Sequence, residues 1–133
     1  MRYFAICLIV LFLLGCDRSQ VLDKKDWKWI KTIDTSGQAI EPIKPDAFIV
    51  SLDFDLNKFT ARTDCNRFFG SFSLSGKNIK FSNIGSTRMR CAASQEQVFI
   101  KQLEKSTHYK ILENTKSLVL EALDGSEMYF DVL

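Results

Sequence analysis

Residues 63–81 read TDCNRFFGSFSLSGKNIKF, and the pattern of this stretch is the main evidence for the fold. Phe68, Phe72 and Leu74 alternate with serines at 71 and 73, and this period of two predicts a half-buried strand. The turn-forming residues 75–78 separate it from a second short strand at 79–81, which is the spacing of a β-hairpin. Gly70, inside the aromatic strand, indicates a bulge or a close backbone approach that lets the sheet bend.

The same alternation recurs on both sides of this hairpin. It predicts further strands at 27–33, 48–54, 109–111, 118–122 and 128–132, with turns at 114–116 and 124–126. Pro42 and Pro45 mark a loop or an edge between the first two strands, because proline cannot donate to a central ladder. A meander of antiparallel strands is the natural interpretation.

One segment has a helical pattern. Ser94 and Gln97 have the spacing of a capping box, in which each side chain satisfies a backbone N–H at the start of a helix. Phe99, Ile100 and Leu103 then form the apolar side of about three turns. We therefore expect an α+β fold that is mainly antiparallel β, with a small curled or barrel-like sheet and one amphipathic helix packed over it.

Composition limits the class of protein. The chain has 133 residues, with 18 Lys and Arg against 16 Asp and Glu, a formal net charge of +2. Without a basic stripe, nucleic acid is not an expected partner. Hydrophobic residues at 46% and charged residues at 26% are typical of one globular domain, which we expect to be a monomer.

The N-terminus has the features of an export signal. Arg2 precedes an apolar run at 4–14, which is too short to span a bilayer before Asp17. The run ends in Leu-Leu-Gly before Cys16, and this resembles the lipobox of bacterial lipoproteins, in which the cysteine is acylated after cleavage. We expect a signal peptide at 1–15, a flexible lipidated tether at 16–26 and a folded domain at 27–133.

Cleavage before Cys16 leaves Cys65 and Cys91 in the mature domain. In an oxidising compartment such a pair more often forms a disulfide than a metal site, and closing this loop contributes roughly 3.5 kcal/mol. A zinc site made with His108 and Asp64 is the alternative, but it lacks the close ligand pairs of structural zinc sites. We expect no metal and no cofactor.

Catalytic residues are not expected. His108 is the single histidine, and general-base chemistry also needs an orienting partner and a nucleophile. Arg67, Arg88 and Arg90 suggest an anion-recognition patch around the cystine, because guanidinium groups bind carboxylates and phosphates in a bidentate way. The alternative is ordinary solvated surface charge.

These residues also carry a family resemblance. A Cys-Asn-x-Phe-x-Gly-x-Phe strand at 65–72, a Ser-Thr-x-Met-x-Cys segment at 86–91 and a helix with Glu96, Phe99 and Leu103 resemble the META domain of HslJ-like lipoproteins over about residues 26–133. The resemblance implies a small barrel-like domain in bacterial envelope proteins that are not established enzymes, with motif residues that define the fold. Asp64 and Ala92 depart from the glycine and proline that are frequent there.

The resulting functional hypothesis is a membrane-anchored, non-catalytic envelope lipoprotein that binds or supports another envelope component, with a stress role implied by the resemblance. The alternative is a binder of a small apolar or lipid-like ligand inside the barrel, which an empty interior of several hundred Å³ would favour. By resemblance to enteric lipoproteins, Asp17 favours the inner membrane with the domain facing the periplasm, and the outer membrane is the competing location.

Overall fold

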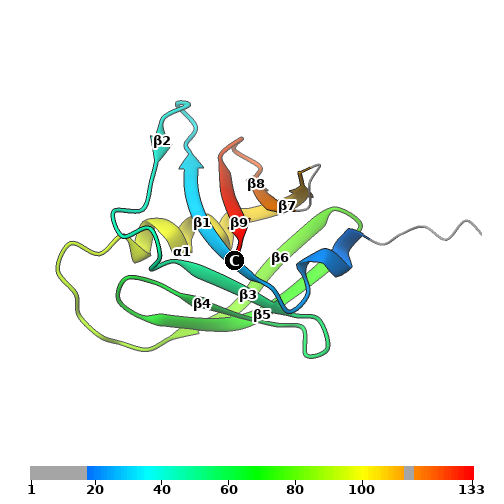
Figure 1. Cartoon of the computed structure of the whole chain (residues 1–133), viewed down its shortest axis with the longest axis horizontal. Coiled ribbons are helices and arrows are strands. Elements are labelled where there is room, and N and C mark those ends of the chain that lie inside the picture. Colours follow the sequence, from blue (N-terminus) through cyan, green and yellow to red (C-terminus); the bar gives the residue numbers. More distant parts are fainter. Residues whose placement is uncertain (1–17, 113–115) are drawn as a thin grey trace, which may run out of the picture.

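The computed structural model describes residues 18–112 and 116–133. The elements in these ranges follow the chain from a 3-10 helix to a C-terminal strand (Figure 1). They are η1 (Arg18–Leu22), β1 (Asp26–Ile33), β2 (Ala39–Ile40), β3 (Ile49–Asp53), β4 (Lys58–Arg62), β5 (Arg67–Ser75), β6 (Asn78–Ser86), α1 (Glu96–Lys105), β7 (Ser106–Ile111), β8 (Ser117–Ala122) and β9 (Glu127–Val132).

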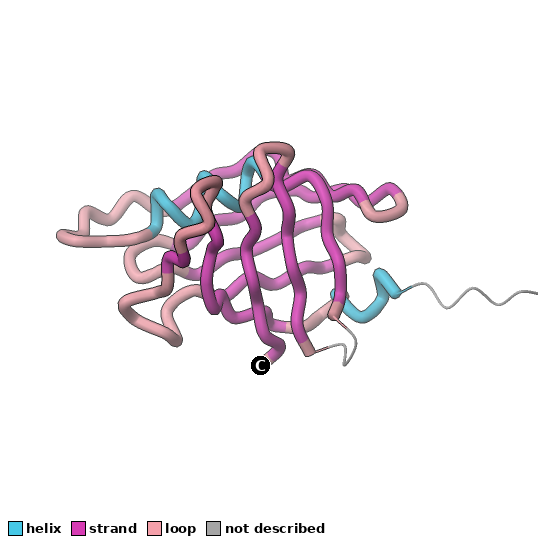
Figure 2. Tube along the Cα trace, turned by 90° about the horizontal axis from the view of Figure 1, so that it is seen from above, coloured by secondary structure: helices cyan, strands magenta, loops and turns pink. Residues whose placement is uncertain are grey.

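The strands form one curled antiparallel sheet. Their order is β2-β1-β3-β4-β5-β6-β7-β8-β9, and β1 also pairs with β9 (Figure 2). This last pairing joins the two sides of the sheet into a ring, and closure hides the edges that an open sheet would expose. The weakest seam is between β6 and β7, where Asn78 and His108 are the paired residues. The predicted α+β class, with a barrel-like sheet and one packed helix, is confirmed.

Aromatic side chains fill the interior of the ring. Phe99 of α1 lies 5.4 Å from Trp29, 5.1 Å from Phe48 and 6.3 Å from Phe130, measured between ring centroids. All four side chains are fully buried. The Phe99 face of α1 is therefore covered by β1, β9 and the segment before β3, as its amphipathic pattern predicts.

The predicted strands are present, but the short strand β2, the strand β4 and the second half of β6 were missed. The pattern of β4 is buried at Phe59 and Ala61 and exposed at Lys58, Thr60 and Arg62, a five-residue alternation that could have been recognised. Strand β6 continues to Ser86, well beyond the predicted end at Phe81. Residues 82–86 of this strand are mostly polar, so the alternation of apolar and polar residues that predicts a strand is weak there.

The predicted bulge at Gly70 is confirmed by a register shift between Phe69 and Ser71. The extra residue lies on the partner strand β6, where Asn83 adopts a left-handed φ of 53°. A second bulge, between Trp29 and Lys31, changes the alternation of β1. Thr32 is consequently the buried residue after this bulge, whereas a strict period of two counted from Trp27 would place Ile33 inside.

The start of α1 differs from the predicted capping box. The N-cap residue is Gln95, and its side chain makes no capping hydrogen bond. The Ser94 hydroxyl accepts from the backbone N–H of Glu96, as expected, but it donates to Asp64. Gln97 is exposed, and the carboxylate at the helix start is that of Asp64, which accepts from the Ser94 hydroxyl and the Gln95 N–H.

The segment expected to be a flexible tether is folded from residue 18 onward. Leu22, at the end of η1, is fully buried in the core, and the Trp27 indole N–H donates to its carbonyl at 3.4 Å. The Lys24 N–H donates to Leu52, and the Asp23 carboxylate accepts from the N–H of Phe54. The prediction that the folded part begins at Trp27 is therefore wrong, because Leu22 supplies a core contact that its polar neighbours concealed.

Candidate functional site

The turn between β4 and β5 holds most of the motif residues. Asn66 is buried, and its side chain bonds to the 87–89 segment: Oδ1 accepts from the Thr87 hydroxyl at 2.9 Å and from the Met89 N–H at 2.7 Å. Its Nδ2 donates to the Met89 carbonyl at 3.0 Å. The amide side chain therefore pairs with the Met89 backbone as a neighbouring strand would.

Glu96, the first residue of α1, completes this cluster. Its carboxylate accepts from the Asn66 N–H at 2.9 Å, from Asn66 Nδ2 at 3.0 Å and from the Thr63 hydroxyl at 3.0 Å. Neutral donors thus surround a carboxylate that is only 9% exposed. Every one of these contacts is internal, so the polar groups of the motif hold the turn, the 87–89 segment and the helix together.

A disulfide connects the same segments. Cys65 and Cys91 are bonded, with their Cα atoms 5.8 Å apart. Asp64 accepts from the Ser94 hydroxyl at 2.5 Å and from the Gln95 N–H at 2.9 Å. A carboxylate at this position satisfies an early helix donor and complements the helix dipole. The residue that departs from the expected glycine therefore ties the turn to α1.

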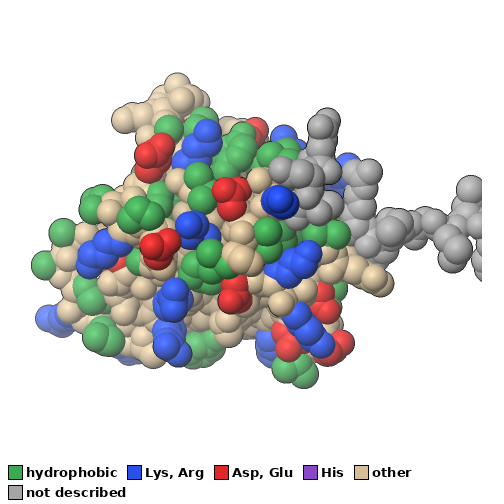
Figure 3. Space-filling model, in the orientation of Figure 1, with side chains coloured by type: hydrophobic (Ala, Val, Ile, Leu, Met, Phe, Trp, Pro, Cys, Tyr) green, Lys and Arg blue, Asp and Glu red, His purple; other side chains and the backbone are tan. Residues whose placement is uncertain are grey.

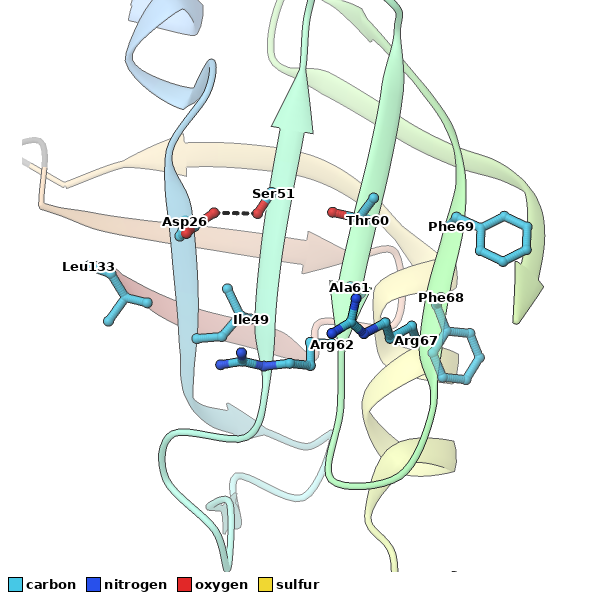
Figure 4. A pocket seen from close by; sticks show the side chains of 10 residues that line it. All are labelled: Asp26, Ile49, Ser51, Thr60, Ala61, Arg62, Arg67, Phe68, Phe69 and Leu133. Carbon is cyan, nitrogen blue, oxygen red and sulfur yellow. Dashed lines mark hydrogen bonds between the residues drawn. The ribbon is translucent and has the colours of Figure 1, made fainter. Parts of the chain in front are cut away.

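The outer face of the sheet carries a groove that sequence reasoning missed. Asp26, Ser51 and Thr60 lie directly opposite one another on β1, β3 and β4, and their short side chains form a polar row across the strands. Longer side chains flank the row, so it becomes the floor of a depression of about 380 Å³, here named the outer groove (Figure 4). Its lining residues are Asp26, Ile49, Ser51, Thr60, Ala61, Arg62, Arg67, Phe68, Phe69 and Leu133.

A neighbouring depression of about 350 Å³ shares this floor. It also includes Asp26, Ser51 and Thr60, and it continues toward Lys24 and Leu56. Both depressions lie outside the barrel, on the face opposite the aromatic core. The hollowed surface is therefore separate from the interior in which a small apolar ligand was considered.

Only one of the three predicted arginines lines the outer groove. Arg67 lines the outer groove and lies directly opposite Arg62 on β4. Figure 4 shows the Arg67 side chain reaching over β4 toward Arg62, while the Arg62 side chain reaches over β3 toward Ile49. Arg88 and Arg90 are exposed in the segment between β6 and α1 and do not line this groove. The residue opposite Arg67 is thus Arg62, which was not selected because strand β4 was not predicted.

The other candidate side chains make local contacts in the structure. His108 is exposed, and its Nδ1 lies 2.9 Å from the neighbouring Thr107 hydroxyl. Across residues 18–112 and 116–133, no group of three or more His, Cys, Asp or Glu side chains is arranged to hold a metal ion. Asp53 accepts from the N–H of Leu56 and stabilises the β3–β4 turn, whereas Asp55 pairs with Lys24 at 2.7 Å.

Charged groups on the opposite side of the barrel are paired with one another. Lys110 and Glu121 form a 2.7 Å salt bridge, and hydrogen bonding to Glu121 raises the pKa of Lys110. The Tyr129 hydroxyl donates to Glu127 at 2.5 Å, and this bond is the main cause of the raised pKa of Tyr129. Figure 3 presents a different face, the one seen in Figure 1, on which blue and red side chains are interspersed. The opposed pair of arginines is therefore unlike the charge pairing on β7 to β9.

The fold and the motif cluster together define a class: a small closed antiparallel barrel with one packed helix, held by a cystine and a buried Asn–Glu contact. The family model of the META domain matches residues 20–132, and the chain belongs to this family.

Solved structures share the fold at low sequence identity. A protein from Burkholderia xenovorans, determined by NMR, has 22% identity and a TM-score of 0.70, with 86% of each chain covered. A DUF4847 family protein from Bacteroides vulgatus has 14% identity and a TM-score of 0.64, covering 85% of this chain and 95% of that one. No curated protein matches the chain. These similarities establish the barrel architecture.

Proposed function

We propose that this chain is an exported lipoprotein acylated on Cys16, whose META domain acts as a non-catalytic binding module at the membrane of the cell envelope. The sequence supports the anchor through its apolar run, its Leu-Leu-Gly segment and the cysteine that follows. Cys16 itself lies outside the described residues. No helix in the described ranges is long and apolar enough to cross a membrane.

The early start of the folded domain supports a position close to the bilayer. Only two residue steps separate Cys16 from Arg18, where η1 begins, and two extended residues span at most about 7 Å. Burial of Leu22 fixes the end of η1 to the barrel. A lipid on Cys16 would consequently hold the domain against the membrane surface instead of on a long tether.

The outer groove is the observation that supports binding over catalysis. It is an open depression with hydroxyl, carboxylate and guanidinium groups, whereas the polar groups of the motif cluster are engaged with one another. The barrel interior is filled by its own side chains, including Trp27, Trp29 and Met128, and this favours an external binding surface over an apolar ligand inside the barrel. We propose that the partner is another envelope component, with the stress role implied by the family resemblance.

Metabolic labelling with a fatty acid tests the anchor. The full-length protein should incorporate label, and a Cys16→Ser variant should lose it because the acylated thiol is absent. Cys7→Ser is the matched control, since this cysteine lies in the predicted signal peptide and its replacement should leave labelling of the mature protein intact. Equal labelling of the wild type and Cys16→Ser would contradict the anchor.

A further inference from the structure

We propose that Arg62 and Arg67 form a binding site for an oxyanion, a carboxylate or phosphate group carried by a ligand that lies along the outer groove. This inference deepens the proposed binding function by naming the chemistry of the ligand. It does not depend on the lipid anchor, so the two can fail separately.

Without a bound ligand, the two arginines are placed unfavourably. Arg62 and Arg67 are directly opposite on adjacent strands, where Cβ atoms lie about 4.5–5.5 Å apart and like charges destabilise the pair. Arg62 Nη2 donates to the Asp46 carbonyl at 3.3 Å, which supplies no formal counter-charge. Within the described residues, the Arg67 guanidinium has neither a hydrogen bond nor a salt bridge, so an external anion would relieve the repulsion.

The two arginine side chains also point in the same direction. Both extend across the sheet toward β1, so the Arg67 guanidinium lies over β4 and the Arg62 guanidinium over β3 (Figure 4). Adjacent strands are about 4.8 Å apart, and this places two planar donor groups in succession beside the floor of the groove. Guanidinium groups donate parallel hydrogen bonds to the paired oxygens of carboxylates and phosphates, which neutral ligands do not provide.

The other residues that line the groove restrict which chemical groups the remainder of the ligand can carry. Ile49 and Leu133 offer apolar contact, and the hydroxyls of Ser51 and Thr60 offer hydrogen bonds. At the β1 end, the Asp26 carboxylate accepts from Ser51 and would repel a second negative charge. A ligand with one oxyanion group and an apolar or hydrogen-bond-donating body therefore fits better than a polyanion.

Lys28 adds a third cationic side chain beside the groove, but it does not change the preference for a ligand with one oxyanion group. It lies opposite Ile49, in line with the two arginines, and pairs with Asp46 at 3.3 Å. The resulting order across four strands is lysine, isoleucine, arginine, arginine. The unpaired positive charge is consequently concentrated at the β4–β5 end.

The test measures thermal unfolding of the full-length protein in detergent micelles at constant ionic strength. One titration uses inorganic phosphate and another uses N-acetyl-leucine, a carboxylate with an apolar side chain, each exchanged against chloride. A ligand that binds the folded state raises the melting temperature in a saturable way. We expect this rise in the wild type and its loss in the Arg62→Gln/Arg67→Gln double variant. The matched control is Arg88→Gln/Arg90→Gln, which removes the same charge outside the groove and should retain the response.

Single variants separate a binding role from a structural role. Each Arg→Gln change should weaken ligand affinity about two- to fivefold, as expected for an exposed ion pair. In chloride alone, Arg67→Gln should be at least as stable as the wild type, because it removes a like-charge contact. Arg67→Lys keeps the positive charge but loses the paired N–H donors of the guanidinium group. This variant should therefore fold normally but bind the ligand more weakly.

The outcomes assign the ligand chemistry or reject the site. A response to phosphate alone identifies a phosphate-bearing ligand, and a stronger response to N-acetyl-leucine identifies a carboxylate with an apolar body. No saturable response to either probe would overturn the proposal. A response kept in Arg62→Gln/Arg67→Gln and lost in Arg88→Gln/Arg90→Gln would overturn it in favour of the segment before α1.

Discussion

The carboxylate of Glu96 accepts two hydrogen bonds from Asn66, one from the backbone N–H at 2.9 Å and one from the side-chain amide at 3.0 Å. These residues are thirty positions apart: Asn66 directly follows Cys65, and Glu96 lies a few residues after Cys91. The contact therefore fixes the helix to the β4–β5 turn by a charged acceptor that has little access to water.

Glu96→Gln should destabilise the domain by about 1–3 kcal/mol, because an amide nitrogen would replace one of the acceptors that face buried donors. The measurement is the free energy of unfolding from urea titrations. Glu104→Gln, at an exposed position on the same helix, is the matched control and should change stability little. Equal stability of Glu96→Gln and Glu104→Gln would show that the buried contact is not needed.

Gly70→Ala should be costly because the barrel leaves no room for a methyl group. A Cβ at this position would lie 2.7 Å from Phe59 Cε1 and 2.7 Å from the Ser82 carbonyl. We expect a loss of about 1–3 kcal/mol in the free energy of unfolding. Gly85→Ala provides the comparison: its Cβ would meet the ring of Phe69, which is 53% exposed and can rotate away. A larger loss for Gly85→Ala would contradict this order.

The bond between Cys65 and Cys91 should be present in protein isolated from its native compartment. Mass analysis without reductant should recover one cystine-linked peptide, and the Cys65→Ser/Cys91→Ser variant should lose about 2–5 kcal/mol of stability. Two free thiols in the isolated protein, or a bound metal, would refute the pairing. The double variant avoids leaving a reactive thiol that could cross-link between molecules.

Tyr129 should titrate at a higher pH than an ordinary tyrosine, because it donates to Glu127 and its pKa is raised above 10.0. A raised pKa in the folded state means that this contribution to stability is complete below about pH 10 and is lost as the pH rises through the folded value. Difference absorbance of tyrosinate, with Tyr129→Phe to identify the signal, measures the shift. Glu127→Gln should return the titration toward pH 10, and an unchanged curve would exclude the carboxylate as its cause.

Asp17→Ser tests the proposed inner-membrane location. If the source is Gram-negative, density-gradient fractionation should recover the wild type with the inner membrane and move the variant to the outer membrane. The reason is the position of this carboxylate beside the proposed acylated terminus, where it could hinder extraction by a carrier. Glu104→Gln, at an exposed position far from the proposed acylated terminus, is the control and should leave the location unchanged. Recovery of the wild type in the outer membrane would falsify the assignment.

Local patterns in the sequence were enough to predict most of the strands and the helix. Alternation of Phe68, Phe72 and Leu74 predicted β5, and the spacing of Phe99 and Leu103 predicted the buried side of α1, because burial on one face imposes a period within a single segment. The cystine pairing was also predicted, since the expected cleavage of a signal peptide and acylation of Cys16 would leave two cysteines with one connectivity.

Which distant residues lie next to one another depends on how the strands pair in the folded barrel. Ring closure through β1 and β9, burial of Leu22 and the contact of Asn66 with Glu96 depend on strand order and register, which no local period encodes. The same reason explains the arginines: their expected position around the cystine grouped Arg67 with Arg88 and Arg90, whereas cross-strand register placed Arg67 opposite Arg62. Residues on one face of a sheet become neighbours through hydrogen-bonded pairing between strands, and that pairing is fixed only when the whole barrel packs around its aromatic core.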